Sequence, residues 1–371
     1  MSRMKNSVCF DDVLLVPRYS TIRSRSDIDL SVKLENVIQP LRSPIISSPM
    51  DTITESAMAL ALLRRGTLGI IHRFNDIDTQ ANMVSAVYEE LEGENCNATA
   101  SIAAAVGVSG DYFERAQALY RAGARVLCVD IAHGHHILMK DALLALRREF
   151  GNKVHLMAGN VATREGFELL VDWGADSVRV GIGGGSICST RIQTGHGMPT
   201  LQSVLDCASS DRDALIIADG GIRTSGDIVK AMAAGADLVM LGSLLSGTDE
   251  TPGEVYIDLT HSQAYIANVT SAGVAEYVEP VGRKYKKYRG MASKEAQVAW
   301  RGYGTSEEGV ATTVDYKGPV APILDSLEKG IRSGLSYSGA KTIAGLQARS
   351  VFTKQTFSGV SESSTHILNK G

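Results

Sequence analysis

No stretch of this sequence is apolar over a length that could span a membrane. Its first residues, MSRMKNSVCFDD, lack the apolar core and cleavage site of a secretory signal. The 371 residues carry a formal net charge of only −4, which argues against a dedicated binder of nucleic acid or membrane surfaces. We therefore expect a globular cytoplasmic protein with neither nucleic acid nor a membrane as its partner.

Cysteine is scarce, and its spacing is uninformative for metals. Five cysteines stand at positions 9, 96, 128, 188 and 207, an odd number without a CxxC pair. This pattern argues against both a disulfide framework and a structural zinc site, and it favours a reducing compartment.

Two common phosphate-binding motifs are also missing around the most glycine-rich segment, residues 176–199. No Gly-Lys-Ser/Thr follows its glycines, and the loop does not run directly into a helix as a dinucleotide fingerprint would. The segment instead reads as a strand followed by Gly181, Gly183, Gly184 and Gly185, with Cys188 among hydroxyl side chains. Such a loop suits an anion and a nucleophilic cysteine, although a tight turn with a small buried cysteine is the alternative.

A rhythm of short apolar runs begins at residue 44 and predicts buried parallel strands. The eight runs are 44–50, 66–73, 102–108, 125–131, 154–161, 177–182, 215–221 and 238–243. Helical patterns between them cover 54–66, 111–124, 163–175 and 224–236. Eight such units predict an α/β fold, a (β/α)8 TIM barrel, with a doubly wound open sheet as the alternative.

The remaining segments are expected to belong to the same barrel domain, which we take to span 1–371. Residues 24–34 alternate like a short strand, and 75–100 hold only a short connection. After the eighth strand, 249–318 form a long polar insertion that we expect to be an active-site flap. A helical pattern at 316–340 closes the barrel, and the tail 351–371 is expected to be mobile or held by a neighbouring subunit.

Candidate chemistry collects at the carboxyl ends of the predicted strands, where barrel enzymes place their sites. Glycines follow the seventh and eighth strands, at Gly220, Gly221 and Gly242, and predict a phosphate cradle. Asp219 suits a sugar diol, with a helix cap or a buried ion pair as the alternative. The histidines 133, 135 and 136 lack a carboxylate at a metal-binding spacing, so we interpret them as a polar loop.

These residues together suggest covalent catalysis on an electrophilic carbon of a phosphorylated, ribose-bearing ligand. Cys188 is the expected nucleophile, and Thr190 can pass a proton to a carboxylate on the flap. We favour Glu308 for that carboxylate, although spacing alone does not separate it from its neighbour Glu307.

Several of these motifs resemble the IMP dehydrogenase/GMP reductase family. The matching segments are FDDVLLVP, SSPMDT, GNVAT, VGIGGGSICSTR, ADGGIR, MLGS and YRGM, in the same order from about residue 8 to 366. The resemblance implies a TIM barrel, a purine nucleotide substrate, a nicotinamide cofactor and a potassium ion, in a homotetramer that sometimes doubles to an octamer.

The resemblance also implies roles for individual residues. Catalysis is expected at Cys188, Thr190 and Glu308; substrate binding at Ser186, Asp219, Gly220, Gly221, Gly242, Ser243, Tyr288, Gly290, Met291 and Ala292; cofactor binding at Arg73, Asp130, Ile131, Ala132, Ile182 and Gly183; and potassium binding through backbone carbonyls at Gly183, Gly185, Cys188 and Arg191. Gly184 stands where the family usually has proline, which is expected to loosen the loop.

Two activities occur in such a family, and the sequence favours one of them. A dehydrogenase that oxidises IMP with NAD needs an adjacent Arg-Tyr pair on its flap to activate water. Here a glycine separates Arg301 from Tyr303, and the CBS regulatory module usual in dehydrogenases is absent. We therefore expect a GMP reductase that uses NADPH, with IMP dehydrogenase as the alternative and a non-catalytic nucleotide-binding barrel as a more distant one.

Overall fold

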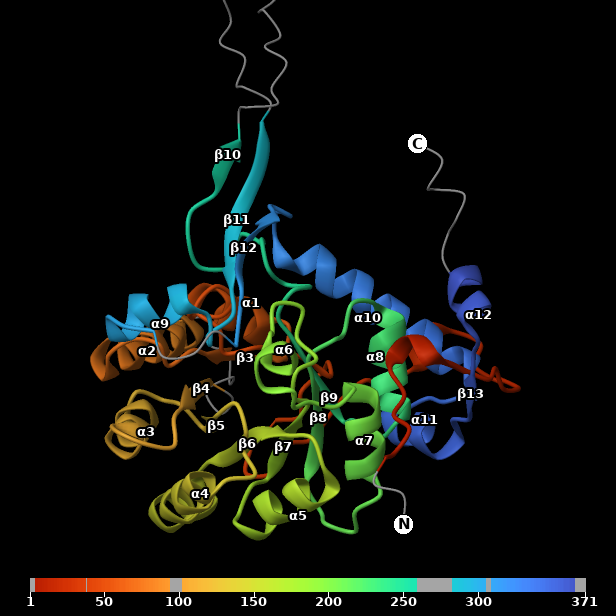
Figure 1. Ribbon diagram of the computed structural model, residues 1–371, viewed down its shortest axis with the longest axis horizontal. Helices are drawn as coiled ribbons and strands as arrows, with labels where there is room; N and C mark the ends of the chain where they lie inside the picture. The colour runs from red at the N-terminus through yellow and green to blue at the C-terminus, as the bar shows by residue number, and fades with distance from the viewer. Residues whose placement is uncertain (1–3, 38, 94–101, 259–281, 305–307, 364–371) are drawn as a thin grey trace, which may run out of the picture.

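Eight parallel strands close into a barrel in the computed structural model of the chain, which describes residues 4–37, 39–93, 102–258, 282–304 and 308–363 (Figure 1). The barrel strands are β2 (Ile45–Ser47), β3 (Leu68–Ile71), β4 (Ala103–Val106), β5 (Val126–Asp130), β6 (His155–Val161), β7 (Ser177–Val180), β8 (Leu215–Asp219) and β9 (Leu238–Leu241). Strand β9 pairs back onto β2, with Met240 opposite Ile46, which closes the ring. Each of the eight predicted apolar runs contains one of these strands, so the predicted (β/α)8 barrel is confirmed.

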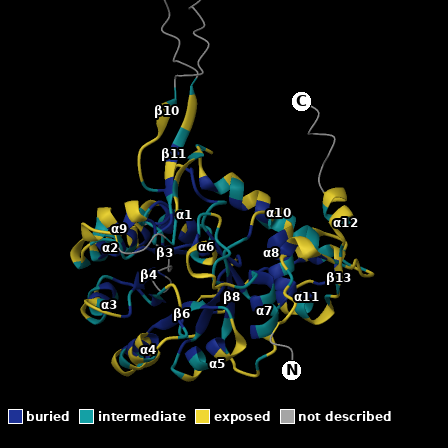
Figure 2. Cartoon of the chain, in the orientation of Figure 1, coloured by how far each residue is buried: buried dark blue, intermediate teal, exposed yellow. Residues whose placement is uncertain are grey.

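Apolar side chains on both faces explain why these runs form barrel strands. Every residue of β3, β4, β7 and β9 is buried, and the dark centre of Figure 2 marks this core. One face of each strand fills the barrel interior and the other packs against the outer helices.

Helices follow the strands around the outside of the barrel. They are α1 (Ser56–Arg64), α2 (Ile77–Gly93), α3 (Tyr112–Arg121), α4 (Ile137–Phe150), α5 (Arg164–Asp172), α7 (Thr200–Ala208), α8 (Ser225–Ala233), α10 (Val320–Tyr337) and α11 (Ile343–Arg349). Helices α1, α3, α5 and α8 confirm the four predicted helical patterns. The connection over 75–100 contains α2, a helix that the sequence analysis did not predict and that buries Val84, Val87 and Leu91 along one face.

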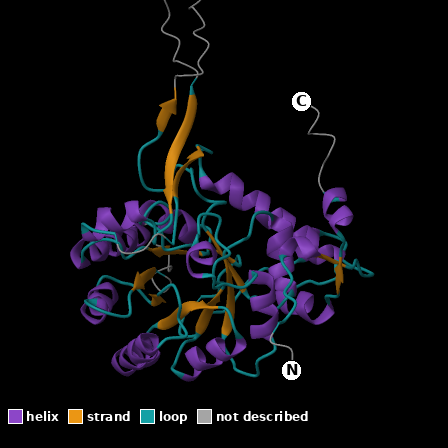
Figure 3. Ribbon diagram, in the orientation of Figure 1, coloured by secondary structure: helices purple, strands orange, loops and turns teal. Residues whose placement is uncertain are grey.

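The flap has secondary structure of its own (Figure 3). It contains β10 (Tyr256–Asp258), β11 (Arg283–Arg289) and β12 (Ala311–Asp315), which form an antiparallel sheet in that order, and α9 (Lys294–Arg301). The β10–β11 pair projects away from the barrel (Figure 1). The predicted flap residues 259–281 lie outside the described residues.

The structure near the two ends of the chain differs from what the sequence pattern predicts. Residues 24–34 form no strand: they hold the short helix η2 (Arg25–Asp27) and a single bridge from Val32 to Leu41. Their alternation reflects one-sided burial instead, since Ile28, Leu30 and Leu34 are all buried. Near the other end, β13 (Phe352–Lys354) pairs with the chain's own β1 (Val13–Leu15), and α12 (Phe357–Glu362) follows it.

The described residues also contain further short helices outside the barrel's outer helices. They are η1 (Phe10–Asp12), η4 (Gly151–Lys153) and α6 (Thr190–Thr194). No helix among the described residues has both the length and the apolar character needed to cross a bilayer.

Candidate active site

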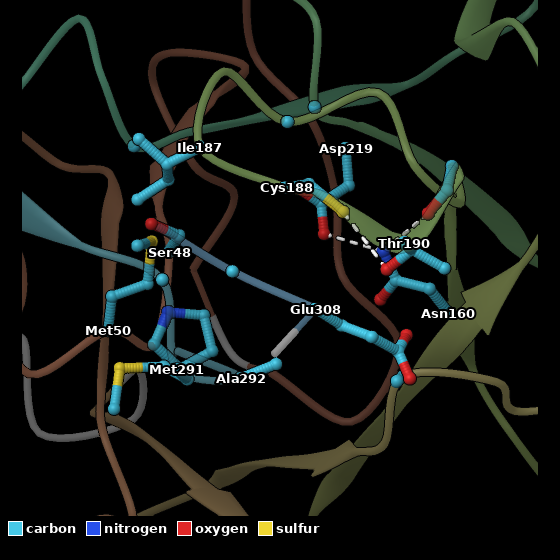
Figure 4. A pocket seen from close by; sticks show the side chains of 18 of the residues that line it. Ser48, Met50, Asn160, Ile187, Cys188, Thr190, Asp219, Met291, Ala292 and Glu308 are labelled. Atoms are coloured by element: carbon cyan, nitrogen blue, oxygen red, sulfur yellow. Dashed lines mark hydrogen bonds between the residues drawn. The ribbon is translucent and has the colours of Figure 1, made fainter. Parts of the chain in front are cut away.

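The predicted nucleophile, Cys188, lies between β7 and α6 with its thiol close to Thr190 (Figure 4). Its Sγ donates a hydrogen bond to Thr190 Oγ1 at 3.1 Å, and its backbone N–H donates to the Gly185 carbonyl at 3.1 Å. Thr190 is the first residue of α6, so the start of that helix fixes its position. The thiol and the hydroxyl that were expected to act together are therefore in contact.

The flap brings the predicted carboxylate to the same place. The loop of residues 181–189, here called the nucleophile loop, forms an antiparallel bridge between Cys188 and Gly309. The N–H of Ser189 donates to the Glu308 carbonyl at 3.1 Å, and the N–H of Val310 donates to the Ile187 carbonyl at 2.9 Å. Figure 4 shows the Glu308 carboxylate directed to the side of the cavity on which Thr190 lies. Its rival Glu307 lies outside the described residues.

Nearly all predicted site residues line one cavity of about 490 Å³ at the carboxyl ends of the strands, here called the first cavity. They are Arg73, Asp130, Ile131, Ala132, Ile182, Gly183, Gly185, Ser186, Cys188, Thr190, Asp219, Gly220, Gly221, Gly242, Ser243, Tyr288, Gly290, Met291, Ala292 and Glu308. Arg191 does not line it; its guanidinium donates to the Met198 carbonyl at 2.7 Å beside the nucleophile loop.

The backbone turn after β9, Gly242–Thr248, lines the first cavity through Gly242 and Ser243 and is here called the phosphate turn, after the ligand that the sequence predicts for it. The N–H groups of Ser243 and Leu244 have no acceptor among the described residues, which suits an anion. A Cβ at Gly242 would lie 3.2 Å from Tyr288 Oη and 3.1 Å from Ser48 Oγ, so a side chain there would require these hydroxyls to shift. Burial raises the pKa of Tyr288, against the opposing effect of a hydrogen bond with Ser186, so its hydroxyl stays neutral and can donate.

A buried arginine on β7 holds two carboxylates at the bottom of the cavity. Arg179 donates to Asp130 Oδ1 at 2.6 Å and to Asp219 Oδ2 at 2.9 Å, and its side chain is only 8% exposed. Burial works against the ionised form of Asp130, but Arg179 and Arg73 outweigh it and lower the pKa of that carboxyl. Asp130 is thus held as a carboxylate.

Asp219 is an ion-pair partner, which was one of the alternatives that the sequence left open for it. Its Oδ2 accepts hydrogen bonds from Arg179 and from Asn160 Nδ2, the latter at 2.8 Å (Figure 4). No described residue donates to Oδ1. The residue is therefore an ion-pair partner through one oxygen and keeps the other oxygen for a ligand such as a sugar diol.

The flap helix α9 lies on the opposite side of the first cavity. Its residues Trp300 and Arg301 also line a second cavity of about 840 Å³. The edge of Trp300 meets Phe74 with ring centroids 5.4 Å apart, and Arg73 Cζ lies 4.9 Å from the Phe74 ring centroid. Both cavities share Arg73, Phe74, Asp130, Ile131, Trp300 and Arg301 in their linings. The two spaces therefore adjoin and together give an elongated site.

Two kinds of metal site were considered from the sequence: one at the histidines 133, 135 and 136, and one for potassium at backbone carbonyls. Within the described residues no group of three or more His, Cys, Asp or Glu side chains could hold a metal ion, and His136 instead caps α4 by accepting from the Leu138 N–H. The carbonyls of Gly185 and Arg191 each accept one loop hydrogen bond, from Cys188 and Gly195. A carbonyl has two lone pairs, so this set still suits a monovalent cation.

Sequence reasoning missed several residues of the site. Arg179 had a signal, since a charged residue inside an apolar strand needs a buried partner. Asn160 and Ser48 followed predicted strands without being assigned a role. Gln297, Trp300 and Arg301 enter the first cavity from α9, a helix that its polar sequence did not reveal.

Comparisons with known proteins agree with this geometry. Residues 7–273 and 263–366 match the family described as IMP dehydrogenase / GMP reductase domain. The chain is 35% identical to inosine-5'-monophosphate dehydrogenase of Nitrosopumilus maritimus, over 98% of each protein. It is 33% identical to GMP reductase of Leishmania major, over 99% of this chain and 98% of that protein.

A solved structure is similar over the same length. It is a cysteine-to-alanine variant of GMP reductase from Trypanosoma brucei in complex with guanosine 5'-monophosphate, with a TM-score of 0.84 and 30% identity over 98% of both chains. The relatives therefore divide between two named activities.

Proposed function

Because the chain belongs to the IMP dehydrogenase/GMP reductase family, we propose that it is a GMP reductase, which converts GMP to IMP and ammonia with NADPH. Membership makes it an oxidoreductase of a family that depends on a nicotinamide dinucleotide. The choice of GMP rests on the flap, and the complex of the similar trypanosomal protein with guanosine 5'-monophosphate supports a purine nucleotide as substrate.

The observation that carries the proposal is the separation of Arg301 from Tyr303. Arg301 ends α9 with its Cζ 4.2 Å from the centroid of the Trp300 ring. Gly302 then reverses the chain in the left-handed region, and Tyr303 is 62% exposed and lines neither cavity described above. A pair that activates water must be held together beside the reacting carbon. Reduction of GMP needs no such pair, because water is not a reactant.

The proposed chemistry uses the contact between Cys188 and Thr190. The thiolate of Cys188 adds to carbon 2 of the purine, the bond from that carbon to the amino group breaks, and ammonia leaves. Thr190, with Glu308 behind it, delivers the proton that the leaving amine needs. The carbon–sulfur bond then breaks as carbon 2 receives a hydride, which returns Cys188 to its starting state.

A nicotinamide cofactor fits the elongated site. The first cavity holds Cys188 and the phosphate turn, while the adjoining second cavity provides space beyond what a mononucleotide needs. The part of the first cavity toward the second is lined by Asp130, Ile131 and Ala132. Trp300 supplies an aromatic face there. When bound, the reduced cofactor supplies the hydride to carbon 2. Potassium at the carbonyls of Gly183, Gly185, Cys188 and Arg191 is part of the same proposal.

The test follows the absorbance of reduced nicotinamide in two reactions that contain potassium. We expect GMP with NADPH to lose absorbance and to release ammonia, while IMP with NAD gives no change. A rise in the second reaction alone would identify an IMP dehydrogenase, an alternative that the relative from Nitrosopumilus maritimus favours. Absence of both signals from protein that binds GMP would indicate a barrel without catalysis.

A pair of variants separates the two activities further. Tyr303→Phe removes the hydroxyl that a dehydrogenase would need, and Thr190→Val removes the proton carrier that both activities need. A reductase is expected to keep its rate in the first variant and to lose it in the second. Loss of rate in Tyr303→Phe would contradict the proposed function.

A further inference from the structure

Two lysines of the flap bind the backbone around the phosphate turn. Lys286, on β11, is only 3% exposed. Its ammonium donates to three carbonyls: Thr248 at 3.0 Å, Asp249 at 3.4 Å and Thr251 at 2.6 Å. Three acceptors match the three N–H donors of an ammonium group, so this buried cation is fully hydrogen-bonded.

Lys317 binds the other part of the turn from the place where the flap returns to the barrel. Its ammonium donates to the Ser243 carbonyl at 3.1 Å and to the Leu244 carbonyl at 3.2 Å. Its own backbone N–H donates to the Gly247 carbonyl at 2.8 Å, and Thr248 and Gly318 form a parallel bridge. The flap therefore holds the turn at both ends.

The residues expected to surround the phosphate contribute no positive side chain. Ser186, Gly221, Gly242, Ser243 and Tyr288 offer hydroxyls and backbone N–H groups only. A phosphate dianion in such a site depends on nearby cations and on oriented peptide dipoles. Lys286 and Lys317 are cations that directly contact the backbone of this turn.

The contact of Lys317 also orients a peptide unit. The carbonyl and the N–H of a trans peptide point in opposite directions. Because Lys317 and Ser246 Oγ both donate to the Ser243 carbonyl, the N–H of the same peptide, on Leu244, points away from them. That N–H is one of the two in the turn without an acceptor among the described residues.

We propose that Lys286 and Lys317 are positioning residues for the 5'-phosphate of the substrate: they act through the backbone of the phosphate turn and couple nucleotide affinity to the seating of the flap. This inference rests on the proposed function only in requiring a nucleotide in the first cavity. It needs neither the identity of the base nor that of the reaction.

The experiment compares a nucleotide with its nucleoside, because only the nucleotide reaches the phosphate turn. Calorimetric dissociation constants are measured for GMP and guanosine on the wild-type chain, Lys286→Met, Lys317→Met and the matched control Lys284→Met. Lys284 is an exposed lysine of the same strand β11. We expect each of the two lysine variants to weaken GMP by roughly tenfold while guanosine changes by less than about twofold. Lys284→Met is expected to bind both as the wild type does.

Steady-state kinetics give the second readout. The two variants are expected to raise the KM for the nucleotide with little change in kcat, because the reacting carbon is untouched. Unchanged GMP affinity in folded Lys317→Met, or equal weakening of GMP and guanosine, would overturn the proposal. If Lys286→Met fails to fold, Lys317→Met, whose side chain lies at the surface, decides the question alone. If the wild type proves to use IMP, the same comparison with IMP and inosine tests the lysines although the proposed function has failed.

Discussion

Arg179 contacts Asp219 through one carboxylate oxygen only. Two of the three guanidinium nitrogens, Nε at 3.1 Å and Nη2 at 2.9 Å, converge on Oδ2. No described residue donates to the second oxygen, Oδ1, and Asp219 lines the cavity that Cys188 also lines. The arginine thus fixes the orientation of the carboxylate and leaves one oxygen for the substrate.

Replacing Asp219 should therefore affect ribose recognition. Asp219→Ala is expected to weaken GMP binding by about 1.5–3 kcal/mol, since a hydrogen bond between a charged group and a hydroxyl is lost. The loss should be much smaller for a dideoxy nucleotide, which lacks both ribose hydroxyls. Equal losses for the two ligands, measured by calorimetry, would show that Asp219 serves only as the partner of Arg179.

Removing the arginine should destabilise the fold in a pH-dependent way. Arg179→Met leaves Asp219 without its cation and Asp130 with only Arg73, and both carboxylates are largely shielded from solvent, so the change is expected to cost up to about 3 kcal/mol near neutral pH. In the wild type the pKa of Asp130 is lowered, so its contribution is present above the ordinary aspartate pKa and is lost as the pH falls through the lowered value.

In Arg179→Met the effect of acidification on stability has the opposite sign. Without Arg179, only Arg73 opposes the effect of burial on Asp130, so the pKa of that carboxyl is expected to rise, and acidification protonates it in the folded state and relieves its cost. The difference in unfolding free energy between wild type and Arg179→Met should therefore shrink between neutral pH and about pH 5. Denaturant titrations at the two pH values measure it, and a constant difference would contradict the ion-pair account.

The pair of Cys188 and Thr190 predicts a graded series. Cys188→Ser is expected to lower kcat by at least about a thousandfold while still binding GMP. Thr190→Val keeps the shape but removes the hydroxyl, and a loss of about a hundredfold is expected. Thr190→Ser keeps the hydroxyl and should stay close to the wild type. Turnover by Cys188→Ser at the wild-type rate would exclude a covalent intermediate.

The glycine that replaces the family's proline has a structural partner. A Cβ at Gly184 would lie 2.4 Å from Thr200 Oγ1, a buried hydroxyl without a hydrogen-bond partner among the described residues. Gly184→Pro alone is expected to cost about 1–3 kcal/mol of stability through overpacking. Adding Thr200→Ala should recover most of it, while Thr200→Ala alone stays near neutral. Thermal melts of the four proteins measure the coupling, and additive effects would argue against this contact.

The barrel could be predicted from the sequence because its strands are apolar on both faces. When seven similar apolar runs precede it, a run such as 238–243 is most simply interpreted as the eighth strand of a parallel barrel. Strand β11 could not be predicted in the same way, since its sequence RKYKKYR reads as a charged loop. Its burial alternates at Lys286 and Tyr288, and it becomes a strand through its pairing with β10 and β12.

The site was predictable where chemistry is local and unpredictable where it depends on distant partners. Cys188 and Thr190 stand two residues apart, so their contact needs only a turn. The ion pairs of Arg179 join β5, β7 and β8, and no spacing rule reveals them. The alternation of 24–34 predicted the buried side chains but not the backbone, because burial and strand pairing are separate conditions.

The bridge between Thr248 and Gly318 places the departure and the return of the flap at one point of the barrel rim. The part of the chain between those residues forms a closed excursion, so its length does not alter the spacing of the barrel strands. The barrel can therefore stay constant while the flap varies during evolution. Because the excursion carries Lys286, Tyr288 and Glu308, a chimera that exchanges only this excursion between two relatives would keep the barrel and inherit both the nucleotide affinity and the reaction outcome of the donor.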